Sequence, residues 1–253
     1  MESFFFALAM LSFALEATLL LRAWRGGFLS QLPIFYSYIL FVLSTSTVNY
    51  LIYFLFPKYY ASAYWFCFIF WLVAEFAVLA EASDHIFKPY QPIRRLGRII
   101  TMSVCVAFFI VYIAPPLLQA QSSKAAMLEL VKRSSLTKAV LIVVLLGAAS
   151  LYRLPLGKNV SGLMLGFATF LAINIANMAL DERYGGAGYA EIFAIVGPVS
   201  FVLALAIWNV ALWQYEPGSF GGRELERSAE NIAEPLANRL GKYDHELTRF
   251  FRR

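Results

Sequence analysis

Hydrophobic residues fall into long runs that are separated by short polar segments. Each run has roughly twenty residues, the length that an α-helix needs to cross about 30 Å of hydrocarbon at about 1.5 Å per residue. The pattern therefore predicts an all-α, polytopic membrane protein, folded as a seven-transmembrane-helix bundle. The predicted spans are residues 3–22, 33–56, 61–82, 98–118, 133–152, 160–180 and 190–214.

The sequence also predicts where the membrane domain ends. Residues 1–215 hold the seven predicted spans and form the transmembrane domain. Residues 216–253 begin with the hinge-like stretch EPGSFGG and continue as a short, charged cytoplasmic tail. The tail is too short for a kinase, cyclase or phosphodiesterase domain, so we expect any signal to leave through a partner.

Composition supports a membrane location and argues against nucleic acid as a partner. The chain is 60% hydrophobic and 15% charged, whereas soluble domains are about 45–50% apolar and about 25% charged. The net charge is +5, but the basic residues lie mostly at the ends of apolar runs, where membrane topology accounts for them. The lipid bilayer is therefore the first expected partner.

The distribution of lysine and arginine predicts the orientation. Cytoplasmic loops of membrane proteins are enriched in these residues. Most of the 21 lysines and arginines fall in the segments after spans 1, 3, 5 and 7. We therefore expect the N-terminus outside, the C-terminus in the cytoplasm, and a multi-pass protein of the bacterial cytoplasmic membrane.

The stretch EASDHIFKPYQPIRRLGR, residues 81–98, is the predicted cytoplasmic loop between spans 3 and 4. Its arginines would hold this edge at the anionic inner leaflet. Glu81 and His85 are spaced i, i+4, a spacing that lets two side chains of one helix bind the same metal ion. Two ligands alone are weak evidence for a metal site, so we predict no metal. We expect Glu81 to pair with the loop arginines. With Lys88 and Pro89, these residues form an inner-loop signature.

Polar residues in spans 2, 5 and 6 suggest a pocket that opens outward. A charged side chain in a span costs about 2.5–3.5 kcal/mol on insertion scales, so each needs a reason. One interpretation is structural, with Lys138 paired to Asp181 and the asparagines bonded across helices. The other is a ligand site that favours an anionic or carbonyl-rich small molecule. Its candidate residues are Asn49, Arg133, Lys138, Asn174, Asn177 and Asp181.

Two carboxylates, Glu16 in span 1 and Glu75 in span 3, form a second candidate layer further inside. Both fall roughly 20 Å from the outer face if each span starts at the interface. The sequence places no basic residue at that depth, so we expect both to be largely protonated, bonding the backbone or Asn209. The alternative is a proton or cation relay, or a switch sensed by the inner loops. A pairing of Arg22 with Glu16 would weaken the switch interpretation.

Several function classes lack their required residues. A retinal protein needs a lysine in the last span, and residues 190–214 contain none. Heptahelical zinc hydrolases need several histidines near the spans, and the chain has only His85 and His245. The two cysteines, Cys67 and Cys105, both lie within apolar runs and do not suggest a disulfide framework. We therefore expect a protein that is not an enzyme and carries no cofactor.

Two segments resemble an uncharacterised group of bacterial heptahelical membrane proteins that is frequent in acidobacterial genomes. The first consists of Glu81 with Ile86-Phe87-Lys88-Pro89-Tyr90 and Leu96-Gly97. The second runs from Leu151-Tyr152-Arg153 through Gly162-Leu163-Met164-Leu165-Gly166-Phe167. With the span pattern, the resemblance covers residues 1–215 and implies the architecture and a bacterial origin.

Three functions remain open on the sequence. The first is a sensor or receptor-like module, with an outer pocket for a small molecule and a cytoplasmic partner bound through residues 81–98 and 216–253. The second is a small-solute or proton-coupled transporter that uses Glu16 and Glu75. The third is an accessory subunit of a membrane complex.

Overall fold

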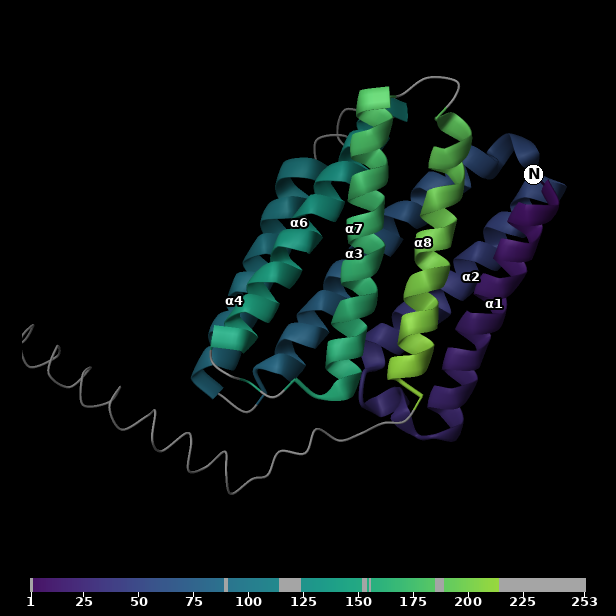
Figure 1. The fold of residues 1–253 in the computed structure, drawn as a ribbon. Coiled ribbons are helices and arrows are strands. Elements are labelled where there is room, and N and C mark those ends of the chain that lie inside the picture. Colours follow the sequence, from purple (N-terminus) through teal and green to yellow (C-terminus); the bar gives the residue numbers. More distant parts are fainter. Residues whose placement is uncertain are drawn as a thin grey trace, which may run out of the picture. The chain divides into compact units, whose positions relative to one another are not determined.

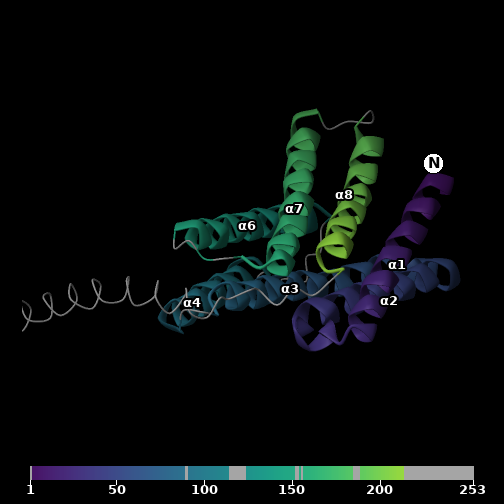
Figure 2. The same ribbon diagram turned by 60° about the horizontal axis from the view of Figure 1, so that its bottom comes forward.

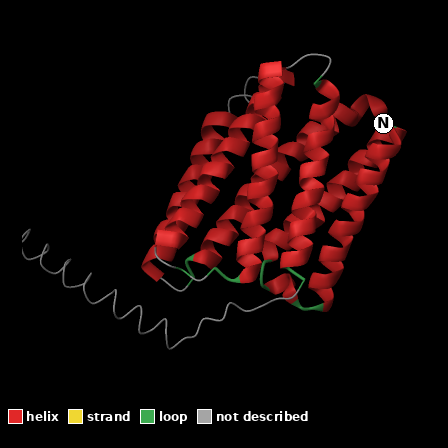
Figure 3. Cartoon of the chain, in the orientation of Figure 1, coloured by secondary structure: helices red, strands yellow, loops and turns green. Residues whose placement is uncertain are grey.

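The computed structural model describes residues 2–88, 91–113, 124–151, 154, 156–184 and 189–213. Within these residues the chain is helical, with turns between the helices and no strand (Figure 3). This confirms the all-α prediction. The charged tail, residues 216–253, and Pro89 lie outside the described residues.

Each predicted span corresponds to one helix, although α4 and α6 begin earlier than predicted. Short 3-10 turns connect α1 to α2 at Phe28–Ser30 and α2 to α3 at Pro57–Tyr59, and α4 continues into a π-helical turn at Phe109–Ile113. The α-helices are α1 Glu2–Arg25, α2 Pro33–Leu55, α3 Tyr60–Ile86, α4 Gln91–Phe108, α6 Lys124–Leu151, α7 Lys158–Tyr184 and α8 Ala190–Ala211.

Six of these helices, all except α4, are long and apolar enough to cross a membrane. They identify the chain as a multi-pass membrane protein. The apolar part of α4 and its π turn covers only residues 97–111, or about 22 Å at 1.5 Å per residue. Within the residues that the structure describes, six helices therefore qualify as crossings by length and composition, and α4 falls short of this standard.

The six long helices close into a ring. Contacts link α1 to α2, α2 to α3, α3 to α6, α6 to α7, α7 to α8, and α8 back to α1. Helix α4 lies outside this ring and packs on α3 and α6 (Figures 1 and 2). We call the end with the start of α1 and the α2–α3 turn the amino end, and the opposite end the basic end.

The closest packing in the ring is between α7 and α8. A Cβ built on Gly162 would lie 2.0 Å from Ala211 Cβ, and one on Gly166 would lie 2.1 Å from Trp208 Nε1. The spacing of the two glycines is the small-xxx-small pattern that lets membrane helices approach closely. Trp208, 1% exposed, fills the space over Gly166 and donates a hydrogen bond to the Leu163 carbonyl at 3.1 Å.

Candidate ligand site

A cavity of about 420 Å³ lies inside the six-helix ring, in the half nearer the amino end. We call it the central cavity. Every ring helix contributes to its wall, and α4 does not, because α4 stands outside the ring. Its polar lining consists of Ser12, Thr45, Ser46, Asn49, Tyr64, Trp71, Glu75, Ser134, Ser135, Lys138 and Asn174.

An ion pair between Lys138 of α6 and Glu75 of α3 lies at this cavity. Lys138 Nζ donates to Glu75 Oε2, and the two side chains are only 5% and 6% exposed. The ammonium also lies 5.9 Å from the centre of the Phe76 ring, within cation–π range. Removing one partner of such a buried pair leaves an uncompensated charge, which typically costs about 3–5 kcal/mol.

This pair corrects two predictions from the sequence. Lys138 was assigned to an outer layer with Asp181 as its partner, and Glu75 to an inner layer without a basic residue. The error lies in the start of α6, which begins at Lys124 rather than near residue 133. Lys138 is therefore about 21 Å along α6 and Glu75 about 22 Å along α3, so the two side chains reach the same depth.

The six predicted pocket residues separate into two groups. Asn49, Lys138 and Asn174 line the central cavity. Arg133, Asn177 and Asp181 do not line it. Arg133 Nε instead donates to Glu129 Oε1 at 2.6 Å, one turn earlier on the same helix.

The asparagines of α7 face α8 more than they face the cavity. Asn174 donates to Ser200 Oγ at 2.8 Å and to the Phe170 carbonyl at 2.7 Å. Asn177, which is buried, accepts from Tyr189 Oη at 2.9 Å. Asn174, Asn177 and Asp181 are spaced i, i+3, i+7 and therefore share one face of α7, but of these three only Asn174 also lines the cavity.

Sequence reasoning missed the aromatic wall of the site. Tyr64, Phe68, Trp71 and Glu75 of α3 all line the cavity. Their spacings of four, three and four residues place them on one face of a helix, so this periodicity was the available signal. Because the neighbouring residues of α3 are also apolar, this aromatic periodicity resembles an ordinary membrane-spanning surface. In the sequence, only Glu75 is distinguished, by its charge.

A buried tyrosine connects the ion pair with Glu16. Trp71 Nε1 donates to Tyr38 Oη at 2.9 Å, and Tyr38 is 2% exposed. Glu75 and Glu16 are both close enough to act electrostatically on the Tyr38 hydroxyl. Glu16 is itself buried, and its Oε2 has no hydrogen-bond partner among the described residues.

The partners considered for Glu16 are engaged elsewhere. Asn209 donates to the carbonyls of Leu15 and Leu205 at 3.1 and 2.9 Å. Arg22 donates to the Trp213 carbonyl at 2.9 Å and lies 5.1 Å from the centre of the Trp213 ring. These contacts join the second half of α1 to the end of α8, and no basic side chain among the described residues pairs with the Glu16 carboxyl.

Glu81 caps the first turn of α2, which corrects the expectation that it pairs with loop arginines. Its two carboxylate oxygens accept the backbone N–H groups of Ile34 at 2.9 Å and Phe35 at 2.8 Å. Pro33 occupies the first position of α2, so these are the next two free donors of that helix. A carboxylate there satisfies both donors and complements the positive end of the helix dipole.

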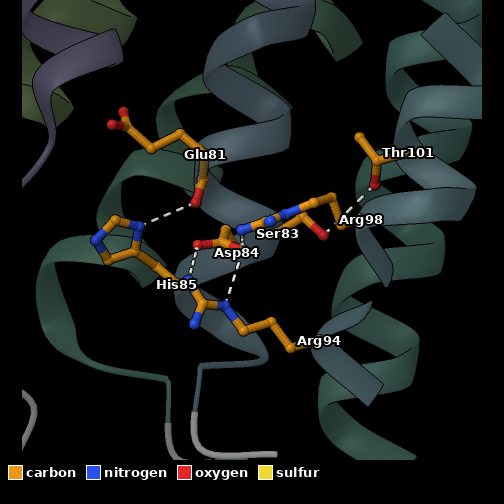
Figure 4. Close-up of polar contacts among 7 residues, drawn as sticks. All are labelled: Glu81, Ser83, Asp84, His85, Arg94, Arg98 and Thr101. Atoms are coloured by element: carbon orange, nitrogen blue, oxygen red, sulfur yellow. Dashed lines mark hydrogen bonds and ion pairs between the residues drawn. The ribbon is translucent and has the colours of Figure 1, made fainter. Parts of the chain in front are cut away.

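The loop arginines bind Asp84 instead (Figure 4). Arg94 Nε donates to Asp84 Oδ1 at 2.9 Å, and Arg98 donates to the same oxygen at 2.7 Å. The hydrogen bond to Asp84 raises the pKa of Arg94 above its usual value, so this guanidinium stays charged. Asp84 thereby fastens the end of α3 to the start of α4.

The remaining signature residues show no metal site. His85 Nδ1 lies 2.9 Å from the Glu81 carbonyl oxygen (Figure 4), and Lys88 is exposed at the end of the turn. No group of three histidine, cysteine, aspartate or glutamate side chains that could hold a metal ion occurs among the described residues. The Glu81 carboxylate is already committed to the backbone of α2.

Comparisons with known proteins identify no relative. No protein-family model, no curated protein and no solved structure matches the chain.

Proposed function

We propose that the protein is a seven-crossing, receptor-like module of the bacterial cytoplasmic membrane. The observation that carries this proposal is the central cavity with the Lys138–Glu75 pair in its wall. Ionisable residues inside membrane segments are rare, and a pocket with a few convergent polar groups is the usual form of a small-molecule site. The cavity would bind a small polar ligand that enters from outside the cell.

Helix directions support the seventh crossing. Asn209 bonds to Leu15 and Arg22 bonds to Trp213, so α8 runs parallel to α1. The direction reverses at each connection, so α3 runs parallel to α1, and α6 runs parallel to α8. Helix α6 therefore runs in the same direction as α3. The chain must therefore return across the bundle between them. Residues 91–113 form α4 and its π turn and are about 34 Å long as a helix. The apolar part, which starts at Gly97, would make that return.

The contacts at the basic end suggest how binding could be reported. Helix α3 supplies Glu75 to the cavity and Glu81 to the start of α2. One turn further, its Asp84 holds the arginines of α4. A ligand that shifts α3 would therefore move residues 81–98, which we place in the cytoplasm because of their positive charge. A cytoplasmic protein would bind there and to the tail, residues 216–253.

The native cysteines provide the test. Cys67 lines the central cavity, whereas Cys105 lies in an apolar groove between α3 and α4. In a Cys105→Ser chain, Cys67 is the remaining thiol, since the sequence has two cysteines. A membrane-impermeant thiol reagent added outside intact cells is expected to label it. The Cys67→Ser chain, which keeps Cys105, is the matched control and should stay unlabelled.

The two other outcomes of this experiment would contradict the proposal. Labelling only in inside-out vesicles would mean that the cavity opens to the cytoplasm, and the orientation would be reversed. No labelling from either side, with the protein folded, would mean that the cavity is closed to solutes.

Proton-coupled transport is the second candidate, and Glu16 is the observation that favours it. A buried carboxyl with an unpartnered oxygen, near Tyr38 and Glu75, could take up and release a proton. This function predicts solute flux in proteoliposomes that collapses in Glu16→Gln. Unchanged flux in that variant would remove Glu16 from the mechanism.

A further inference from the structure

The central cavity holds two buried polar atoms that have no hydrogen-bond partner among the described residues. They are Asn49 Oδ1 and Ser134 Oγ. Ser134 is 1% exposed, and an unsatisfied buried group of this kind costs about 1–3 kcal/mol. Buried polar atoms are normally satisfied, so each exception asks for an explanation. Both atoms lie in the wall of the same cavity, which points to a ligand that supplies the missing partners.

The charges of the cavity wall restrict the ligand further. Among the described lining residues, Lys138 and Glu75 are the charged ones, and they compensate each other. A ligand with a single charge would leave one charge unbalanced at membrane depth, where this is most costly. A ligand with one positive and one negative group leaves the site neutral.

Both members of the pair retain capacity for further bonds. An ammonium has three donors, and the Lys138 ammonium uses one of them on Glu75 Oε2. Glu75 Oε1 makes no hydrogen bond within the described part of the chain. A ligand carboxylate can thus accept from Lys138 and from Ser134 Oγ, while a ligand ammonium can donate to Glu75 Oε1.

The rest of the cavity suits an aromatic body. Rings from three helices form a continuous wall, with Phe68 and Trp71 6.1 Å apart, Trp71 and Phe201 6.2 Å apart, and Phe201 and Phe170 6.0 Å apart between centroids. Such edge-to-face rings pack favourably on another aromatic ring. Asn49 lies closer to the amino end, where its oxygen can accept a hydrogen bond from a donor on that ring.

We propose that the ligand of the central cavity is a zwitterionic amino acid with an aromatic side chain that carries a hydrogen-bond donor. This rests on the proposed function, since it names the ligand of that same site. The carboxylate binds Lys138 and Ser134, the ammonium binds Glu75, and the ring lies along the wall of Phe68, Trp71 and Phe201.

Four probes that share the 4-hydroxyphenyl ring and differ in their charged groups test the proposal on the full chain in lipid nanodiscs. L-Tyrosine carries both the ammonium and the carboxylate. The analogue 3-(4-hydroxyphenyl)propionate lacks the amine, tyramine lacks the carboxylate, and 4-ethylphenol lacks both. Calorimetric titration is expected to give L-tyrosine an affinity at least about tenfold above each of the others, because each lacks a charge that the site would otherwise leave unpaired.

Two variants separate the roles of the wall. Ser134→Ala should weaken L-tyrosine binding several-fold, whereas Ser83→Ala, a buried serine at the basic end that does not line the cavity, should not. Glu75→Gln removes the negative charge but keeps the shape and an acceptor for Lys138. It should reverse the preference, so that 3-(4-hydroxyphenyl)propionate binds more tightly than L-tyrosine.

Other results would contradict the proposal that the ligand is a zwitterion. Equal or tighter binding of 3-(4-hydroxyphenyl)propionate by the native chain would make the ligand an anion, and the same result with tyramine would make it a cation. If no probe binds, the ligand class is wrong. The labelling of Cys67 from outside then decides separately whether the cavity is open to external solutes, as the proposed function requires.

Discussion

Glu81 Oε2 accepts a hydrogen bond from the backbone N–H of Phe35 at 2.8 Å, although the two residues are 46 positions apart. The side chain of one membrane helix thus provides the cap of another. Because Phe35 is 0% exposed, water cannot replace the carboxylate there. This relationship gives Glu81 a structural role that its place beside the loop arginines did not suggest.

Removing the cap should destabilise the bundle. Glu81→Ala leaves the N–H groups of Ile34 and Phe35 without a partner, and we expect a loss of about 1–3 kcal/mol in the free energy of unfolding. Glu81→Gln keeps an acceptor and should lose less. Thermal unfolding in detergent measures both, with the exposed Lys88→Ala as control. A Glu81→Ala protein as stable as the native chain would contradict the capping role.

Adding a methyl group at Gly166 should separate α7 from α8. Its Cβ would lie 2.1 Å from Trp208 Nε1, so Gly166→Ala must displace the indole and its hydrogen bond to Leu163. We expect a loss of about 1–3 kcal/mol, as for other overpacked sites. Gly147→Ala is the matched control, because nothing lies within 4 Å of its Cβ. Equal stability of the two variants would disprove the close contact.

The buried pair should show strong coupling between its members. Lys138→Met leaves Glu75 as a lone buried charge and should cost about 3–5 kcal/mol, whereas the double change to methionine at both positions should recover most of this loss. The exposed pair of Lys132 with Glu182 is the control, and its removal should change stability little. Additive losses at residues 75 and 138 would show that the pair does not form.

Reporter fusions should fix the orientation. A fluorescent protein that folds only in the cytoplasm should be bright when fused after Arg253 and dark when inserted after Lys58, in the α2–α3 turn at the amino end. The reason is the concentration of lysine and arginine at the basic end. A dark fusion at Arg253 would place the tail outside and remove the proposed cytoplasmic partner.

The helices were predictable and the contacts between them were not. Long apolar runs located the seven α-helices of the described residues, because helix length in a membrane is set by the thickness of the hydrocarbon. The start of α6 was missed, since its first turns contain Lys124, Glu129 and Lys132, and hydropathy does not recognise a helix that continues in polar residues. That error of about nine residues assigned Lys138 and Glu75 to different depths.

Tertiary partners explain the other differences. The residues near Glu81 in the sequence do not indicate that its carboxylate caps α2. The backbone N–H groups that it accepts belong to Ile34 and Phe35, in an earlier segment of the chain. Asp84 lies in the same stretch, about one turn after Glu81 and nearer the start of α4, where it meets Arg94 and Arg98. The sequence thus indicated which side chains needed partners, while the arrangement of helices determined which partner each one has.

The separation of Glu75 and Lys138 by 63 residues has a consequence for synthesis of the chain. At ribosomal rates of about 5–20 residues per second, α6 emerges roughly 3–13 s after Glu75 has left the ribosome. During that interval α3 enters the bilayer without its cation. The insertion machinery therefore handles Glu75 before its partner is available, and the ion pair forms only after α6 has entered the bilayer.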